Sequence, residues 1–378
     1  MQDLIIRNGH LLDLAVGLDQ VGDIAVENGR ISRIGSLEKE KAGQEIDAQG
    51  CYVTPGLIDY HAHVCYGISD FSMPADLACL PSGVTGVVDG GSAGSSNFEA
   101  FYRHIISDSV VDIKAFLHVS NVGQPTHDYP EEMNPDRFNK HRILELCHRY
   151  PDTIIGLKLR QSAEIAGKYG LDPLRKALLI AEEAGLRLSV HSSNPPGEAT
   201  GILELLRPGD IFCHVFHQEG STILDDKGKI LPAVWKARER GVLFDMAHGS
   251  MQFSGLVARR AIAEGFLPDI VSSDLSLLSL YRQPTHSFVY ILSELLNLGM
   301  DFRQIITRCT ETPGRLANPD FTGFMHQGAP ADLAILRVMN HEVRYKDRYD
   351  NEYMGNRLIK PEATIKNGVV MFRQYDFL

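Results

Sequence analysis

The sequence lacks the features of a secreted, disulfide-bonded or membrane-spanning protein. None of its six cysteines forms a CxxC pair, whereas a disulfide framework would show closer, repeated spacings. The N-terminal segment has no basic stretch followed by a long apolar run, so no signal peptide is predicted. No uninterrupted apolar stretch approaches the roughly 20 residues that a transmembrane helix needs. We therefore expect a cytoplasmic protein with reduced thiols and no membrane partner.

Basic residues are also in the minority. The 378-residue chain has 37 Lys and Arg against 48 Asp and Glu, a formal net charge of −11, which argues against nucleic acid as the main partner. With 44% hydrophobic and 22% charged residues, the composition is globular rather than disordered. The length allows two or three domains, or one large barrel with an appendage. The expected partner is a small-molecule substrate, and a homo-oligomer is left open.

Both ends of the chain carry hairpin signals. The dipeptide Asn-Gly stands between alternating apolar and polar runs at positions 28–29 and again at 367–368, which is the strongest short signal for a β-hairpin. Residues 331–338 form a further candidate strand. We predict that residues 1–52 and 329–378 join into one small composite β-sandwich.

Between these ends, short apolar runs alternate with amphipathic helical stretches. Eight runs are candidate strands: residues 53–59, 84–89, 113–119, 153–159, 186–190, 210–214, 242–246 and 269–273. Eight strand-then-helix units over this length describe a (β/α)8 TIM barrel of the α/β class. We predict that residues 53–328 form this barrel.

Side chains that can bind metal ions stand at the ends of five of the predicted strands. They are His61, His63, Lys158, His191, His214 and Asp274. His61 and His63 are two residues apart, so an extended backbone points them to the same side. The carboxyl ends of barrel strands form the active-site face, so we expect all six residues at one rim. Imidazole and carboxylate ligands favour zinc, although manganese, cobalt or iron also fit, and the chemistry such a set serves is metal-assisted hydrolysis.

Lys158 is the unusual member of this set, because an ammonium group repels cations. Reaction of its amine with CO₂ gives a carbamate, whose two oxygens can bridge two metal ions. We therefore predict that Lys158 is carbamylated and that the site holds two divalent ions, with zinc preferred.

Several segments resemble those of a known family. Residues 53–63, VTPGLIDYHAH, resemble the signature of the amidohydrolase superfamily, and the remaining candidate ligands follow in the order of its binuclear, carbamylated-lysine branch. Residues 90–94, 156–160 and 245–249 are similar to segments of a dihydroorotase-like subgroup, some of whose members are deacetylases. The resemblance covers nearly the whole chain and implies a metal-dependent hydrolase that cleaves an amide or ester bond.

The resemblance also implies a role for each ligand. His61, His63 and Asp274 would hold one metal ion. His191 and His214 would hold the other, and carbamylated Lys158 and a hydroxide would bridge the two. Asp274 would be the catalytic residue, because it would take the proton of the attacking hydroxide and deliver it to the leaving group.

Arg160 gives the main indication of the substrate. It lies two residues beyond Lys158, so the two share a face of the strand, and its guanidinium could bind a substrate carboxylate bidentately. We predict deacylation of a small N-acyl amino acid or O-acyl hydroxy acid. Further candidate substrate contacts are Ser92, His248 and Tyr281.

Three other functions compete with deacylation. A cyclic amidase of the dihydroorotase or hydantoinase type is one, although dihydroorotases resemble one another in an arginine two residues after the second histidine, where this chain has Cys65. A serine esterase is another, because residues 90–94, GGSAG, match the G-x-S-x-G nucleophile elbow around Ser92. The third is a non-catalytic scaffold barrel, but such proteins lack the metal ligands, and all six are present here.

Overall fold

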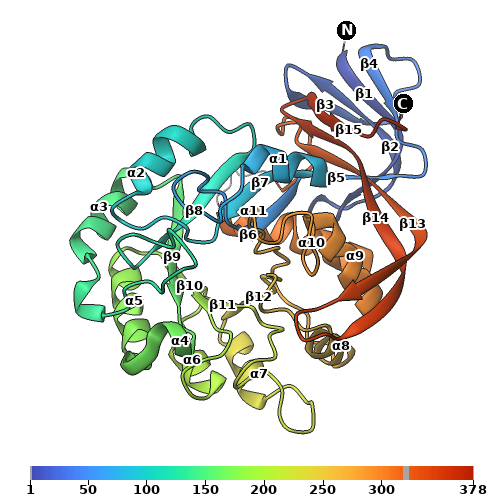
Figure 1. Ribbon diagram of the computed structural model, residues 1–378. Helices are drawn as coiled ribbons and strands as arrows, with labels where there is room; N and C mark the ends of the chain where they lie inside the picture. The colour runs from blue at the N-terminus through green and yellow to red at the C-terminus, as the bar shows by residue number, and fades with distance from the viewer. Residues whose placement is uncertain (1, 318–322, 378) are drawn as a thin grey trace.

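The computed structural model describes residues 2–317 and 323–377 of the chain. Two sheets organise these residues, one parallel with seven strands and one mixed with eight strands. Figure 1 shows helices around the outside of the parallel sheet, with the mixed sheet at one side of the molecule. In the described part of the chain, no helix combines the length and apolar character needed to cross a membrane.

The parallel sheet forms the wall of the barrel, and its strands follow one another in chain order. They are β6 (Leu57–Ala62), β7 (Val84–Asp89), β8 (Asp112–His118), β9 (Ile154–Arg160), β10 (Arg187–His191), β11 (Ile211–Cys213) and β12 (Leu243–Asp245). Isolated parallel bridges, from Asp245 to Ile270 and from Ala62 to Leu275, join the two edges of this sheet. The predicted (β/α)8 barrel is therefore confirmed.

The expected strand at residues 269–273 is wrong in detail, because this eighth position of the barrel forms bridges rather than a ladder. The amide of Val271 donates to the Arg308 carbonyl at 3.1 Å, outside the barrel sheet. At Asp274 the backbone turns into the left-handed region, with φ 52°, so an extended strand ends there.

Helices and short helical turns connect the strands. The α-helices are α1 (Ala75–Cys79), α2 (Phe98–Phe101), α3 (Lys140–Arg149), α4 (Ala163–Ala166), α5 (Asp172–Glu183), α6 (Ala199–Leu205), α7 (Pro232–Glu239), α8 (Gly255–Ala263), α9 (Phe288–Leu298), α10 (Phe302–Arg308) and α11 (Glu311–Ala317). The short turns are η1 (Leu14–Val16), η2 (Leu80–Ser82), the π-helical η3 (Tyr102–Ile106), η4 (Pro135–Arg137) and η5 (Gly167–Tyr169). In α5, buried residues recur at three- and four-residue steps at Leu174, Ala177 and Ala181, which places one apolar face against the barrel.

The mixed sheet is built from both ends of the chain, as predicted. Its strands are β1 (Gln2–Asp13), β2 (Leu18–Glu27), β3 (Arg30–Gly35), β4 (Ala42–Asp47), β5 (Tyr52–Pro55), β13 (Leu333–Lys346), β14 (Glu352–Lys366) and β15 (Val369–Arg373). The Asn-Gly pairs at 28–29 and 367–368 join β2 to β3 and β14 to β15, with positive φ at all four residues. Apolar side chains from both ends pack into one cluster, which includes Leu4, Val26 and Ile335.

The predicted strand at 53–59 is divided between the two sheets. β5 pairs with β13 in the mixed sheet, whereas β6 begins the barrel. Gly56 stands between them, where a Cβ atom would lie 2.0 Å from the Thr85 hydroxyl. A side chain therefore has no room at this crossing.

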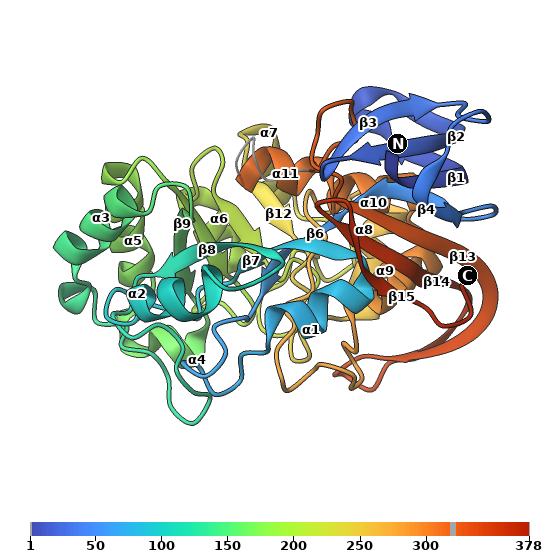
Figure 2. The same cartoon turned by 90° about the horizontal axis from the view of Figure 1, so that it is seen from above.

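The β13–β14 hairpin is longer than the predicted strand at 331–338. Figures 1 and 2 show it curving away from the other strands of the mixed sheet towards α8 and α9. Asn297 on α9 donates to the Arg357 carbonyl at 2.8 Å, and the amide of Gly255 at the start of α8 donates to Asp347 at 2.9 Å. These contacts with barrel helices hold the part of the hairpin that lies beyond the predicted strand.

Candidate metal centre

The six candidate ligands line one pocket at the carboxyl ends of the barrel strands. They are His61 on β6, His63 just after it, Lys158 on β9, His191 at the end of β10, His214 after β11, and Asp274. The parallel strands bring these residues together because their carboxyl ends meet at the same rim.

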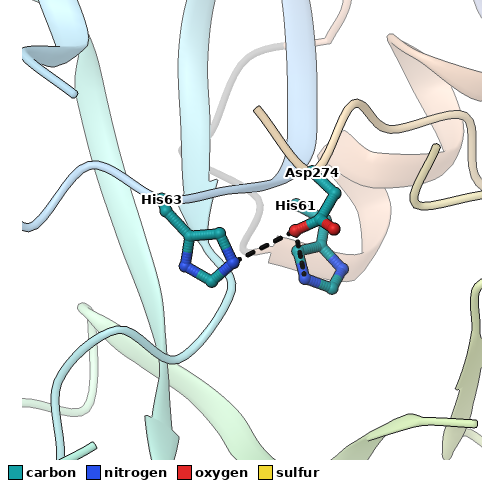
Figure 3. A group of neighbouring side chains, drawn as sticks. All are labelled: His61, His63 and Asp274. Carbon is teal, nitrogen blue, oxygen red and sulfur yellow. Dashed lines mark ion pairs between the residues drawn. The ribbon is translucent and has the colours of Figure 1, made fainter. Parts of the chain in front are cut away.

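The side chains lie within contact distance of one another around Asp274. His63 Nε2 is 3.0 Å and His61 Nε2 is 3.5 Å from Asp274 Oδ1 (Figure 3). The same Nε2 atom of His61 lies 3.1 Å from Lys158 Nζ. The rings of His191 and His214 are 4.2 Å apart between centroids. The ligand atoms of His61, His63 and Asp274 are close enough together to share one metal ion.

Hydrogen bonds on the outer side of three imidazoles select their tautomers. Ser92 Oγ donates to Asp89 at 2.8 Å, so it accepts from His63 Nδ1, also at 2.8 Å. His214 Nδ1 donates to the Ala247 carbonyl at 2.7 Å. In the same way, His61 Nδ1 donates to Asp245 at 3.3 Å. Each ring therefore keeps the lone pair of Nε2 for the pocket.

His191 is oriented the other way. Its Nε2 is 2.6 Å from Ser193 Oγ, which leaves Nδ1 for the pocket. Four imidazoles with one free nitrogen each, together with a carboxylate, are a donor set that fits divalent metal ions.

Burial favours the neutral form of three imidazoles, and the carboxyl group of Asp274 is ionised. Burial lowers the pKa of His191 and of His214 well below the usual value, and it also lowers the pKa of His61. Burial by itself would raise the pKa of Asp274, but its contacts with His63 and the neighbouring imidazoles lower that pKa. Neutral imidazole and carboxylate are the forms that bind metals.

Lys158 is buried at 1% exposure and makes no ion pair with any described residue. An unpaired ammonium group in such a position is costly.

The backbone is strained where two candidate ligands stand. His214 has φ 60° and Asp274 has φ 52°, and Ala247, which accepts from His214, has φ 37°. Residues with side chains rarely adopt these angles, at a cost of about 1–3 kcal/mol each, and such positions cluster at functional sites.

Arg160 lines the same pocket and is paired with a buried acid. Its Nη1 donates to Glu131 Oε1 at 2.9 Å. Burial by itself would raise the pKa of Glu131, but the positive charge of Arg160 outweighs it and lowers that pKa. Glu131 is therefore a carboxylate beside the predicted substrate-binding arginine.

The other three predicted substrate contacts lie elsewhere. Ser92 is fully buried behind His63, and its hydroxyl is engaged by Asp89. His248 is 1% exposed, because Nε2 contacts Glu294 at 2.8 Å and its ring stacks on Phe253. Tyr281 is 57% exposed and lies outside the pocket lining. None of these three residues is in the pocket lining, and the Ser92 hydroxyl is hydrogen-bonded to both His63 and Asp89.

Several residues that sequence reasoning missed also line the pocket. They are Phe71, His127, Ser250, Met251, Gln252, Ser276 and Leu278. All of them stand in loops that follow barrel strands, which is the position of functional residues in this fold. That rule identifies the loops but not the residues within them.

Comparisons with known proteins agree with this geometry. No protein-family model matches the chain. A deacetylase of Agrobacterium fabrum is 32% identical over 341 residues, which cover 89% of this chain and 83% of that protein. The chain belongs to the amidohydrolase superfamily. A deacetylase of Brucella anthropi, 31% identical over 92% of this chain and 87% of its own, places this amidohydrolase in the dihydroorotase-like and deacetylase group.

Solved structures extend the comparison. A dihydroorotase crystal structure matches this amidohydrolase with a TM-score of 0.90 and 29% identity, over 97% of this chain and 98% of its own. An adenine deaminase matches with a TM-score of 0.91 and 26% identity, over 99% of this chain and 100% of its own. An L-hydantoinase from Arthrobacter aurescens, at 16% identity and a TM-score of 0.70, shares the fold. These relatives are hydrolases, and the protein is a metal-dependent hydrolase of the same superfamily.

Proposed function

We propose that this amidohydrolase deacylates a small N-acyl amino acid or O-acyl hydroxy acid at a binuclear metal centre. The observation that carries the proposal is the position of Arg160, whose guanidinium lines the same pocket as the four imidazoles and Asp274. Two relatives with the name deacetylase support it.

In this proposal, His61, His63 and Asp274 hold one metal ion, and His191 and His214 hold the other. Lys158, carbamylated by CO₂, would be a further ligand, and zinc would be the preferred metal because of the histidine ligands. When bound, the two ions supply Lewis acidity, which activates water and polarises the acyl carbonyl group.

Asp274 is the proposed general base and acid. A carboxylate that is ionised at neutral pH has the lone pair needed to accept a proton from the attacking water. The same carboxyl group then delivers the proton to the leaving nitrogen or oxygen. The contact between Asp274 Oδ1 and His63 Nε2, at 3.0 Å, supports a role for this carboxylate inside the pocket.

Arg160 is the proposed anchor for the substrate carboxylate. Only Nη1 donates to Glu131 in the described structure, and a guanidinium has five N–H donors. The remaining N–H groups of Arg160 would bind the carboxylate at one end of the substrate, and the acyl group at the other end would face the metal ligands.

A cyclic amidase is the second candidate, because the dihydroorotase structure superposes over nearly the whole chain. Against dihydroorotate itself stands Cys65, a buried residue whose thiol pKa is raised by burial. A neutral buried thiol does not replace an arginine that binds a carboxylate.

The six cysteines are buried and free, which supports a place in the reducing cytoplasm.

The test is a substrate screen with zinc-loaded enzyme. The panel holds N-acetyl amino acids of both chiralities, O-acetyl hydroxy acids, the matching carboxamides, dihydroorotate and hydantoins. Hydrolysis of acetylated carboxylates, with the carboxamides at least tenfold poorer in kcat/KM, supports the proposal. Turnover confined to the cyclic amides would refute it in favour of a cyclic amidase.

A further inference from the structure

Glu131 lies in the loop between β8 and η4. It does not line the pocket, but it contacts Arg160, the proposed substrate-binding residue. Its carboxylate is 3% exposed, and Oε1 accepts from Arg160 Nη1 at 2.9 Å. Burying a carboxylate is costly unless a cation compensates it. The pairing of Glu131 with Arg160 is therefore a built feature of this rim.

His118 contacts Glu131 from a second direction. His118 Nδ1 accepts from the Ser120 amide at 3.0 Å, so the hydrogen of the neutral ring is on Nε2. That nitrogen lies 3.8 Å from Glu131 Oε1 and has no hydrogen-bond partner. Because His118 pairs with Lys158 between β8 and β9, the strands of the barrel hold the ring in place. Glu131 Oε1 thus lies between the ring of His118 and the guanidinium of Arg160.

We infer that Glu131 is a positioning residue for Arg160. It fixes one edge of the guanidinium and so directs the remaining N–H groups at the substrate carboxylate. Arginine side chains lose considerable rotamer freedom when they bind a ligand, and a guanidinium held in advance avoids part of that cost. This inference rests on the proposed function, in which Arg160 binds a carboxylate.

Glu131 could also weaken substrate binding. A carboxylate beside Arg160 also competes with the substrate for the same positive charge. If competition dominated, loss of the Glu131 charge would strengthen substrate binding. If positioning dominates, loss of the side chain weakens binding, and a variant that keeps the acceptor oxygen is close to wild type.

The experiment compares Glu131→Ala, Glu131→Gln, Arg160→Met and the double variant Glu131→Ala/Arg160→Met. The probe is the acetylated carboxylate that wild-type enzyme hydrolyses fastest, alongside its carboxamide. We expect Glu131→Ala to raise KM for the carboxylate about tenfold, with kcat and carboxamide hydrolysis little changed. We expect Glu131→Gln to stay within about threefold of wild type, because the amide oxygen still accepts from Arg160. In the Arg160→Met background, Glu131→Ala should have no further effect on carboxylate selectivity.

The matched control is Glu362→Ala. Glu362 is likewise 3% exposed and accepts from an arginine, Arg337, at 2.6 Å, but it lies in the mixed sheet. Circular dichroism and zinc content check that each variant is folded and loaded with metal. Glu362→Ala should leave the KM ratio of carboxylate to carboxamide unchanged, whatever it does to stability.

The outcomes separate this inference from the proposed function. If Arg160→Met lowers carboxylate selectivity but Glu131→Ala leaves it unchanged or improves it, the positioning role is wrong and the proposed function stands. An equal loss in Glu131→Gln and Glu131→Ala also contradicts positioning through the acceptor oxygen. If Arg160→Met does not alter selectivity, or no acetylated carboxylate is hydrolysed, the proposed function fails and the inference fails with it.

Discussion

Replacement of Ser92 by alanine tests how the barrel orients His63. The Ser92 hydroxyl accepts from His63 Nδ1 and donates to Asp89, each at 2.8 Å. Asp89 still accepts from the amides of Val64, Gly91 and Ser92, at 2.9, 3.0 and 2.7 Å, when the hydroxyl is removed. Ser72 Oγ, which donates to the same hydroxyl at a longer 3.4 Å, loses an acceptor as well. The larger loss falls on His63, whose buried N–H would be left without an acceptor.

An unpartnered buried donor costs about 1–3 kcal/mol. Groups that orient a metal-binding histidine from behind change metal affinity by about 10- to 100-fold when removed. We expect Ser92→Ala to bind zinc about 10- to 100-fold more weakly in competition with a chelating indicator. At saturating zinc, kcat should be within about tenfold of wild type, because Ser92 touches no substrate.

The matched control is Ser162→Ala. Ser162 is also fully buried and follows a barrel strand, but its hydroxyl has no hydrogen-bond partner in the structure. Its zinc affinity should equal that of wild type. Unchanged zinc affinity in Ser92→Ala would refute the orientation argument. Loss of all activity at saturating zinc would instead point to Ser92 as the nucleophile of a serine esterase.

Two further variants test other parts of the account. Asp274→Asn should lower kcat by about 10²- to 10⁴-fold, because an amide cannot accept the proton. Circular dichroism should show an intact fold. A kcat near that of wild type would exclude Asp274 as the base. Burial lowers the pKa of His217 to about 4, so between about pH 6.5 and 4 the unfolded chain binds a proton that the folded one does not. The free energy of unfolding therefore decreases as the pH falls through this interval. Between pH 7 and pH 5, urea unfolding should show that His217→Leu loses about 2 kcal/mol less of this free energy than wild type does. Equal losses in the two proteins would refute the prediction.

The parts of the fold that could be predicted depend on local patterns. Asn-Gly at 28–29 and 367–368 identified both hairpins, because positive φ is required at such turns. The His61–His63 pair and Lys158 could be assigned to one rim because parallel strands end on the same side of a barrel. The eighth strand was predicted from its apolar run, but the left-handed turn at Asp274 leaves no signal of that kind.

The contacts that hold the predicted substrate residues involve partners distant in sequence. His248 is held by Glu294, which lies 46 residues away on α9. Arg160 is paired with Glu131, 29 residues earlier in a loop whose path no periodicity describes. Ser92 is different, since Asp89 lies three residues before it, yet a serine after a strand reads equally well as a substrate contact or a nucleophile. Only tertiary packing shows which contacts each of these side chains makes.

The most direct test of the central claim is the zinc content of Lys158→Ala. Wild-type protein and the variant are purified with zinc and bicarbonate, and metal is measured by mass spectrometry on the folded chain. The account predicts two zinc ions per chain in the wild type and loss of most of this metal, with loss of activity, in Lys158→Ala. A variant that kept two zinc ions and full activity would contradict a centre built on carbamylated Lys158.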